Sequence, residues 1–470
     1  MMKRWKHDLS LRLVKLLHII LISVPYGLCW YGYYADRMYL PFYNKGNWVI
    51  VALFVVLYVT FARVYEALLL SLRRVSELVY SQGLAIFLSD GVLFLVTCLL
   101  VRKLPNPLPA LTTFVLQFAL AVLWSLLANK WYFAFFPPRR SVIIYDRREI
   151  LEKRFDQYEL EKKFHVERVL LAEECLRDLT QLESAEAVFL SGIRSHERNI
   201  FLKYCVEQDI QAYVLPSVGD VLMSGAKRVH MFHLAMLQVG RYRPSPVYLF
   251  CKRVFDIVGS GLAMILLSPV FLGTAIAIKL TDGGPVIYKQ ERLTKDGRVF
   301  WLHKFRSMRV DAEKDGVARL SSGENDDRIT PVGRRIRKLR IDELPQLFDV
   351  FVGALSIVGP RPERPQIAEE YCRVMPEFRL RLQAKAGLTG YAQVYGKYNT
   401  PPGEKLRMDL MYIAKPGFVE DLRICFATVK ILFMPESTEG IREGATTAME
   451  PEQTPKNSEE EPTAGDRGHG

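Results

Sequence analysis

The residues best suited to chemistry are two adjacent carboxylates, Asp342 and Glu343, which directly follow a basic run. That run, Arg334-Arg335-Ile336-Arg337-Lys338-Leu339-Arg340, holds five cations. Phosphoryl transfer from a nucleotide diphosphate needs such a set: one carboxylate can attack phosphorus or position a nucleophile, the other can hold Mg²⁺, and the cations neutralise phosphate oxygens. Adjacent helical residues point about 100° apart, so we expect the two carboxylates to take different roles rather than share a proton.

Three further motifs surround this pair. Lys304 opens a basic pair in a strand-like context, Lys304-Phe305-Arg306. Gly359-Pro360-Arg361-Pro362 sets a guanidinium on a stiff backbone suited to bidentate phosphate contact. Gly387-Leu388-Thr389-Gly390 follows. Each piece alone has a plainer interpretation: the carboxylates as a solvated helix face, the basic run as a lipid-headgroup contact, the glycine-proline segment as a tight turn. Their order along the chain carries the argument.

From Lys252 to about Phe433, that order resembles the polyprenyl-phosphate hexose-1-phosphate transferases, the bacterial sugar transferase family that starts exopolysaccharide, capsule and O-antigen synthesis. The resemblance implies that Asp342 is the nucleophile, forming a phospho-sugar enzyme intermediate with release of UMP, and that Glu343 binds Mg²⁺. Arg340 joins the cations expected to bind substrate beside this pair. With less weight, the resemblance associates a further set with substrate or metal binding: Lys304, Arg337, Arg361, Asp409 and Asp421.

The chain departs from the family pattern at three positions. Asp349 stands where an asparagine is usual, and Ala386 replaces the proline before Gly387, which should loosen that turn. Lys397 replaces a common arginine, exchanging a bidentate donor for a point charge. We expect these changes to affect sugar or nucleotide selectivity more than the reaction.

The elements that must position these residues begin with a predicted membrane bundle, residues 1–138. Half of the chain is hydrophobic although 24% is charged, so the apolar residues are segregated into runs. Four runs approach the ~20 residues that cross a bilayer as a helix: Leu16–Tyr34, Trp48–Leu70, Leu84–Val101 and Leu108–Phe136. Arg63 and Glu66 interrupt the second and could pair where the helix continues along the membrane surface. Asp90 in the third is expected to face the bundle or the interface.

Charge indicates the orientation. Basic residues precede the first run and follow the second and fourth, so the positive-inside rule places both ends of the bundle in the cytoplasm. The chain carries +12, and its end, residues 446–470, carries −4, which leaves +16 on the rest. Such a surplus suits an anionic membrane or polyanionic substrates. Nucleic acid is the weakest alternative, because the cations cluster beside carboxylates and membrane runs.

Residues 139–241 are predicted to form a Rossmann-like α/β module. Strand-like runs at Val142–Tyr145, Val169–Leu171, Ala187–Leu190 and Ala212–Leu215 alternate with charged, helix-like stretches such as Glu197–Glu207. A dinucleotide site needs a glycine-rich turn after the first strand, and Asp146-Arg147-Arg148-Glu149 has no glycine there. We therefore expect a structural or regulatory module that binds no dinucleotide.

The α/β-type, membrane-associated catalytic domain is predicted over residues 252–433 and opens with an apolar stretch, Ile257–Ile278. Ser268-Pro269 breaks it, and the segment 254–280 is expected to enter the cytoplasmic leaflet and return without crossing. Lys252 and Arg253 at one end and Lys279 at the other could then lie at the same negatively charged surface. Residues 446–470 have a disorder-prone composition.

The predicted protein is therefore a multi-pass protein of the bacterial inner membrane whose catalytic domain faces the cytoplasm. Its substrates would be a UDP-hexose and undecaprenyl phosphate, with Mg²⁺ as cofactor, and the bundle could support a homodimer. Two alternatives stay open: Asp342 as general base for direct attack by the lipid phosphate, and a catalytically silent scaffold of polysaccharide assembly. The seven scattered cysteines are expected to be reduced. The motifs do not identify the sugar.

Overall fold

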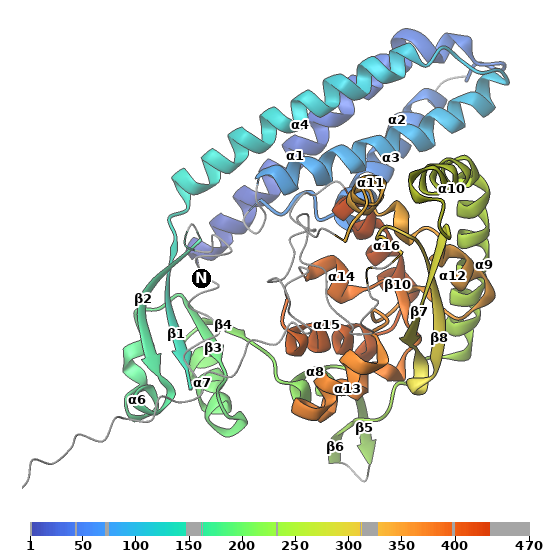
Figure 1. Ribbon diagram of the computed structural model, residues 1–470. Coiled ribbons are helices and arrows are strands. Elements are labelled where there is room, and N and C mark those ends of the chain that lie inside the picture. The colour runs from blue at the N-terminus through green and yellow to red at the C-terminus, as the bar shows by residue number, and fades with distance from the viewer. Residues whose placement is uncertain are drawn as a thin grey trace, which may run out of the picture.

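A computed structural model of the chain describes residues 2–42, 45–70, 75–146, 161, 163–231, 234–310, 312, 328–396 and 400–432. Figure 1 shows three parts: a bundle of long helices, a small α/β unit beyond its end, and a larger mixed domain beneath it. The acidic stretch 446–470 lies outside the described residues. All seven cysteines are described and free of disulfides, which agrees with the expectation.

Four N-terminal helices are long and apolar enough to cross a membrane, as the hydropathy runs predict. They are α1 (Met2–Cys29), which continues as a π-helical turn over Trp30–Tyr34, α2 (Gly46–Val64), α3 (Val75–Val101) and α4 (Leu108–Phe135). The carboxylate oxygens of Asp90 are buried within the bundle, where they line a small cavity with Tyr26 and Tyr34. Asp90 is therefore bundle-facing.

The second helix differs from the sequence-based expectation at its end. The run was predicted to continue as helix past Glu66, but α2 ends at Val64, and Glu66 adopts a left-handed backbone with φ 55°. Below this end, Phe426 of the mixed domain packs against Phe61 and Tyr65 with ring centroids 5.8 and 5.7 Å apart. The bundle is therefore docked directly on the mixed domain.

The α/β unit is built on a four-stranded, all-parallel sheet in the order β2-β1-β3-β4. β3 and β4 lie within one residue of the predicted runs, whereas β1 and β2 begin three and five residues earlier than predicted. Helix α7 (Ser195–Glu207) matches the predicted helix to within two residues. β1 carries an uninterrupted buried run, as expected for a parallel strand covered on both faces. The strands are β1 (Arg139–Tyr145), β2 (Phe164–Leu171), β3 (Ala187–Ser191) and β4 (Gln211–Val214), with α6 (Ala172–Arg177) after β2. The glycine-free turn lies outside the described residues from Arg147 on.

The boundary of this unit lies earlier than the predicted residue 241. Helix α8 (Val218–Ser224) packs against α15 (Pro402–Ala414) of the mixed domain, and Val221 shares a buried core with Leu406 and Leu410. A Cβ atom at Gly225 would lie 2.6 Å from the Ala414 oxygen, so the contact is close. Beyond α8, the hairpin of β5 (Lys227–Met231) and β6 (Leu234–Gln238) is largely exposed.

The apolar segment that opens the mixed domain is broken as the sequence predicts. Helices α9 (Pro246–Leu266) and α10 (Ser268–Asp282) meet at a bend of 61°. Pro269 lacks the amide that would bond the carbonyl of Ile265 four residues earlier. The Ser268 hydroxyl donates to that oxygen at 2.8 Å, so the break leaves the carbonyl satisfied.

Helix α9 is held by polar contacts on its inner face. Asp256 is buried and accepts from the Ile357 amide at 2.9 Å, and Arg253 donates to the carbonyls of Val350 and Phe351 at 2.8 and 2.7 Å. Lys252 pairs with buried Asp421 at 2.8 Å. Both side chains therefore turn into the protein, and the placement of this helix end at the membrane surface stays a prediction. The outer face of the helix is apolar and exposed.

The rest of the mixed domain alternates short helices and strands. An antiparallel hairpin, β7 (Ile287–Leu293) and β8 (Val299–Phe305), lies beside a parallel pair, β9 (Ser356–Val358) and β10 (Gly387–Thr389). The helices around them are α11 (Pro331–Lys338), α12 (Gln346–Val352), α13 (Pro365–Val374), α14 (Tyr391–Tyr395), α15 and α16 (Phe418–Leu432).

Candidate active site

The carboxylate pair lies in a tight turn between two short helices. Helix α11 is capped by Thr330, whose hydroxyl accepts from the Gly333 amide at 2.9 Å, and it ends at Lys338. Arg340 then takes a left-handed backbone, φ 53°, which starts the 3₁₀ turn Ile341–Glu343. Such a conformation is uncommon for arginine and costs about 1 kcal/mol or more. Its effect is to turn both carboxylates away from the line of the helix.

Glu343 is surrounded by cations from three separate segments. Its Oε1 atom lies 3.4 Å from Lys304 Nζ and 3.5 Å from Arg361 Nη2, and its Oε2 atom lies 3.9 Å from Arg340 Nη1. The side chain is 18% exposed. Burial alone would raise the pKa of Glu343, but these three cations together lower it to about 2. Glu343 is therefore a carboxylate whose ionised form is favoured by the three cations around it.

Asp342 sits beside this ring in a different electrostatic state. It is buried, and burial raises the pKa of its carboxyl to about 6, with the charge of Glu343 adding to the rise and Lys304, Arg337 and Arg340 opposing it. Burial also lowers the pKa of Lys304. The pKa values of the two carboxyls are therefore shifted in opposite directions, and their different roles stay a prediction.

Arg361 reaches Glu343 because two glycine-containing motifs interlock beneath it. A Cβ atom at Gly359 would lie 2.3 Å from the Lys385 oxygen, and one at Gly387 would lie 2.1 Å from the Gly359 amide nitrogen. A Cβ atom at Gly390 would lie 2.1 Å from the Gly359 oxygen. Only glycine allows backbones to approach this closely. Arg361 and Thr389 are 28 residues apart in the sequence, but their motifs meet at the parallel β9–β10 pair. This pair supports the backbone from which Arg361 projects.

The structure brings together most of the predicted site residues. Lys304, Arg340 and Arg361 surround Glu343, and Arg337 contributes to the field at Asp342. Two predicted residues make their contacts elsewhere, and their assignment to substrate or metal binding stays a prediction.

Those two residues are both buried acids in ion pairs. Asp409, 1% exposed, lies 2.6 Å from Arg381 Nη2. Asp421 accepts from Lys252 and from Tyr248, each at 2.8 Å, and from Tyr412 at 2.8 Å, which ties α9 to α15 and α16.

Two of the departures from the family pattern have local partners. Asp349 is buried and binds His303 twice, through the amide at 2.9 Å and the ring Nδ1 at 2.6 Å. The Ala386 amide, which a proline would lack, donates to Thr294 Oγ1 at 3.2 Å. This bond is one contact that holds the turn, and the loosening expected from the lost proline stays a prediction. Lys397 lies outside the described residues.

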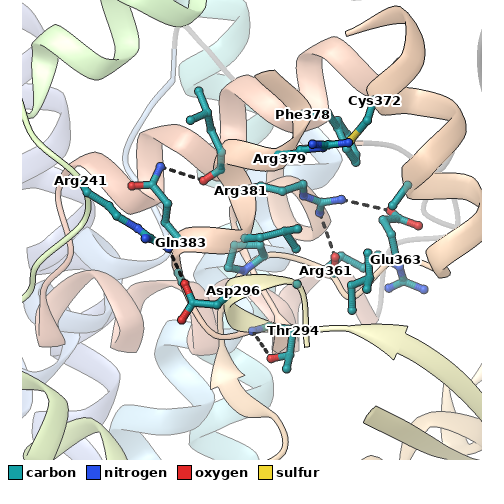
Figure 2. A pocket seen from close by; sticks show the side chains of 18 of the residues that line it. Arg241, Thr294, Asp296, Arg361, Glu363, Cys372, Phe378, Arg379, Arg381 and Gln383 are labelled. Atoms are coloured by element: carbon teal, nitrogen blue, oxygen red, sulfur yellow. Dashed lines mark hydrogen bonds and ion pairs between the residues drawn. The ribbon is translucent and has the colours of Figure 1, made fainter. Parts of the chain in front are cut away.

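The sequence analysis missed a buried set of charges behind Arg361, namely Arg292, Glu363 and Arg381. Arg381 lies 3.5 Å from Glu363, and Arg292 lies 4.0 Å from the same carboxylate. Figure 2 shows Arg381 pointing toward Glu363 and toward the main chain at Arg361, at the wall of a cavity of about 1040 Å³. The only local signal for Arg381 is an arginine between two leucines, Leu380 and Leu382.

The residues present fit a magnesium ion that shares its coordination with a substrate. Among the described residues, no group of three or more His, Cys, Asp and Glu side chains could hold a metal ion. Mg²⁺ is commonly bound by one or two carboxylates together with substrate phosphates. Glu343, which is ionised and partly accessible, with Asp342 beside it, provides that kind of donor set.

Comparison with known proteins identifies the mixed domain. Residues 247–435 match the family model for bacterial sugar transferases. The chain is 38% identical to UDP-N-acetylgalactosamine-undecaprenyl-phosphate N-acetylgalactosaminephosphotransferase of Aeromonas hydrophila. The match covers 235 residues, which are 49% of this chain and 54% of that protein. The chain is also 42% identical to UDP-glucose:undecaprenyl-phosphate glucose-1-phosphate transferase of Klebsiella pneumoniae. This match covers 183 residues, which are 38% of this chain and 39% of that protein. The match thus spans about half or less of these two relatives.

A third relative is matched almost over its whole length. The exopolysaccharide production protein PSS of Rhizobium leguminosarum bv. phaseoli is 39% identical over 190 residues, which are 38% of this chain and 94% of that protein. The segment matched by the family model, residues 247–435, includes all of the residues gathered around Glu343. The chain therefore belongs to the bacterial sugar transferase family.

Proposed function

We propose that this protein transfers a hexose-1-phosphate from a UDP-sugar to undecaprenyl phosphate and releases UMP, the initiating step of exopolysaccharide, capsule or O-antigen synthesis. The observation that carries the proposal is the pairing of a buried Asp342 with Glu343 inside the ring of Lys304, Arg340 and Arg361. The activities for which the Aeromonas and Klebsiella relatives are named support the choice of substrates.

The proposed reaction has two displacement steps at the same phosphorus. A carboxylate oxygen of Asp342 attacks the β-phosphorus of the UDP-sugar, and the bond from that phosphorus to the bridging oxygen breaks, so that UMP leaves with the electron pair. An oxygen of the lipid phosphate then attacks the phosphorus of the aspartyl phospho-sugar, and the Asp342 carboxylate leaves. The net products are undecaprenyl-diphospho-hexose and UMP. Because the steps are separate, the two polyanionic substrates never occupy the site together.

The cations and Glu343 have distinct tasks in this scheme. Lys304, Arg340 and Arg361 neutralise the charge that develops on the phosphate oxygens during each displacement. Glu343 would hold Mg²⁺, which when bound neutralises further phosphate charge. Asp342 must lose its proton before it can attack, and its raised pKa keeps it a stronger nucleophile than an ordinary aspartate once ionised.

The membrane geometry is part of the proposal. The bundle, α1 to α4, would cross the membrane four times, and the bent pair α9–α10 would enter the cytoplasmic leaflet and return. The exposed outer face of α9 supports this, with Val258, Leu262 and Ile265 between 56 and 72% exposed. Both arrangements leave Asp342 on the cytoplasmic side, where UDP-sugars are made, close to the headgroups where the lipid phosphate lies.

The proposal is tested with membranes that contain the protein, undecaprenyl phosphate, Mg²⁺ and a panel of UDP-sugars. UDP-glucose, UDP-galactose and UDP-N-acetylgalactosamine are the first candidates, and the readouts are UMP and a lipid-linked sugar. One donor should give both products in equal amounts. If no donor on the panel yields UMP although the protein is folded and membrane-inserted, the scaffold alternative is favoured.

A further inference from the structure

The main chain that carries Arg361 is held by two buried guanidinium groups. Arg381 Nη2 donates to the main-chain oxygen of Arg361 at 2.9 Å, and Arg292 Nη1 donates to the oxygen of Pro362, the next residue, at 3.0 Å. Both donors are charged, so these hydrogen bonds are stronger than ordinary amide–carbonyl bonds. They fix two consecutive peptide units at the position where Arg361 must aim at Glu343.

Arg381 is itself fixed by acids on two other elements. It lies 2.6 Å from Asp409 in α15 and 3.5 Å from Glu363 just before α13, and its side chain is only 4% exposed. Burial would lower the pKa of Arg381, but the two carboxylates more than compensate and raise it, so the guanidinium stays charged. Burial raises the pKa of Asp409 to about 6, against the opposing effect of Arg381.

The planar geometry of arginine matters at this position. One Nη atom of Arg381 reaches Asp409 and Arg361, while the other reaches Glu363. A lysine ammonium is a single point and has no second nitrogen with which to reach Glu363. The geometry therefore requires a guanidinium, and not only a positive charge, between α15 and the Arg361 main chain.

We propose that Arg381, with Asp409 as its counterion, is a positioning residue for Arg361. It lies behind the cationic ring around Glu343 and holds the main chain from which Arg361 projects. Asp409 then acts through Arg381 and Arg361 and makes no contact with substrate or metal. The proposal gives a physical reason for an acid in this position, which the family resemblance associates with substrate or metal binding. It rests on the proposed function in that Arg361 must stabilise the reacting phosphate.

Figure 2 shows the contacts of Arg381 with Glu363 and with the main chain of Arg361. The charges lie at the wall of the cavity of about 1040 Å³, and Arg381, Glu363 and Arg361 all border it. Loss of the positive charge would leave the carboxylates of Glu363 and Asp409 without their shared partner, whereas Arg381→Lys keeps a cation between them. In that variant the backbone, supported by Gly359 and Gly387, can stay folded while the Arg361 side chain is no longer held in position.

The test measures UMP release by the full-length protein in membranes, in a double-mutant cycle. Arg381→Lys should fold with a thermal midpoint close to that of the wild type, and it should lower kcat about 10²-fold, as expected for misplacement of a catalytic group by about 1 Å. KM for the UDP-sugar should change much less. Added to Arg361→Ala, the Arg381→Lys change should cost little more, because its effect passes through Arg361.

Asp409→Asn is the second variant, since it keeps the side-chain shape and removes the counterion, and it should show the same dependence on Arg361. Arg373→Lys is the matched control, because Arg373 is 74% exposed and pairs with Glu369 on its own helix; it should leave the rate unchanged. Effects of Arg381→Lys and Arg361→Ala that multiply would overturn the proposal, as would a loss of rate that follows the loss of folded protein. A wild-type protein without UMP release would instead reject the proposed function itself.

Discussion

The ammonium nitrogen of Lys304 lies 3.4 Å from Oε1 of Glu343, although the first residue ends a β-hairpin and the second ends a 3₁₀ turn. The same ammonium also interacts with Asp342, the neighbour of Glu343, and opposes the rise that burial causes in the pKa of Asp342. The contact makes the hairpin, the turn and the carboxylate pair one functional unit. It also separates the two carboxylates chemically, because the pKa of Glu343 is lowered while burial raises the pKa of Asp342.

The first prediction separates the two carboxylates by substitution. Asp342→Asn should abolish UMP release, by several orders of magnitude, because an amide cannot form the phospho-sugar bond. Glu343→Gln should reduce the rate strongly and raise the Mg²⁺ concentration needed for half-maximal activity. Steady-state UMP release across a Mg²⁺ titration distinguishes the two, with Arg373→Lys again as control. Near-normal turnover by Asp342→Asn would remove Asp342 from the nucleophile's role.

The second prediction concerns pH. The raised pKa of Asp342, about 6, means that its reactive, ionised form is lost as the pH falls through that value, so kcat/KM should fall on the acid side. Because the pKa of Glu343 is lowered, this residue should not contribute a second ionisation to the acid side of the kcat/KM profile. On the alkaline side, the lowered pKa of Lys304 should bring a loss of activity below the usual lysine range, as the ammonium is deprotonated. A profile that is flat from roughly pH 5 to 8 would contradict the assignment of Asp342.

The third prediction tests the support under Arg361. Gly359→Ala would place a methyl group 2.3 Å from the Lys385 oxygen, so β9 and β10 must separate. We expect a loss of about 2 kcal/mol or more in stability together with a loss of UMP release. Gly417→Ala is the matched control, because a Cβ atom there has no neighbour within 4 Å. Thermal unfolding in detergent measures the stability of the two variants. Equal midpoints for Gly359→Ala and Gly417→Ala would show that the close approach is unimportant.

The fourth prediction concerns the bent pair α9–α10. Single cysteine reporters replace Val247, before the bend, and Lys295, after it, in a background whose native cysteines are serines. In intact cells both should resist a membrane-impermeant thiol reagent, and both should react once the membrane is opened. Labelling of the Lys295 site alone in intact cells would mean that the pair crosses the membrane.

Much of this architecture could be predicted from sequence because its signals are local. Four apolar runs gave the span-capable helices, and the alternation of strand-like and charged stretches gave the parallel sheet. The Pro269 break and the Ser268 bond at Ile265 follow from proline's missing amide. The residues around Glu343 were found because each belongs to a dense, ordered motif.

The parts that could not be predicted depend on partners far apart in the chain. The sequence places Lys252 at the membrane surface, but its side chain turns inward and pairs with Asp421, 169 residues away. Helix α8 follows the α/β unit in sequence, yet packs on α15, nearly two hundred residues later. Arg381 has no motif at all, and its role is visible only from the Arg361 oxygen and the Asp409 carboxylate that it contacts.

The most direct test of the account is to trap the phospho-sugar on the protein. Purified protein is mixed with Mg²⁺ and a donor UDP-sugar labelled in its β-phosphate, without the lipid acceptor, then quenched, digested and examined by mass spectrometry. The account predicts a stoichiometric burst of UMP, label on the peptide that contains Asp342, and transfer of that label to undecaprenyl phosphate when the lipid is added. Asp342→Asn should give neither burst nor label. UMP release that begins only after the lipid is added, with no label on the protein at any time, would contradict the covalent route and favour Asp342 as a general base.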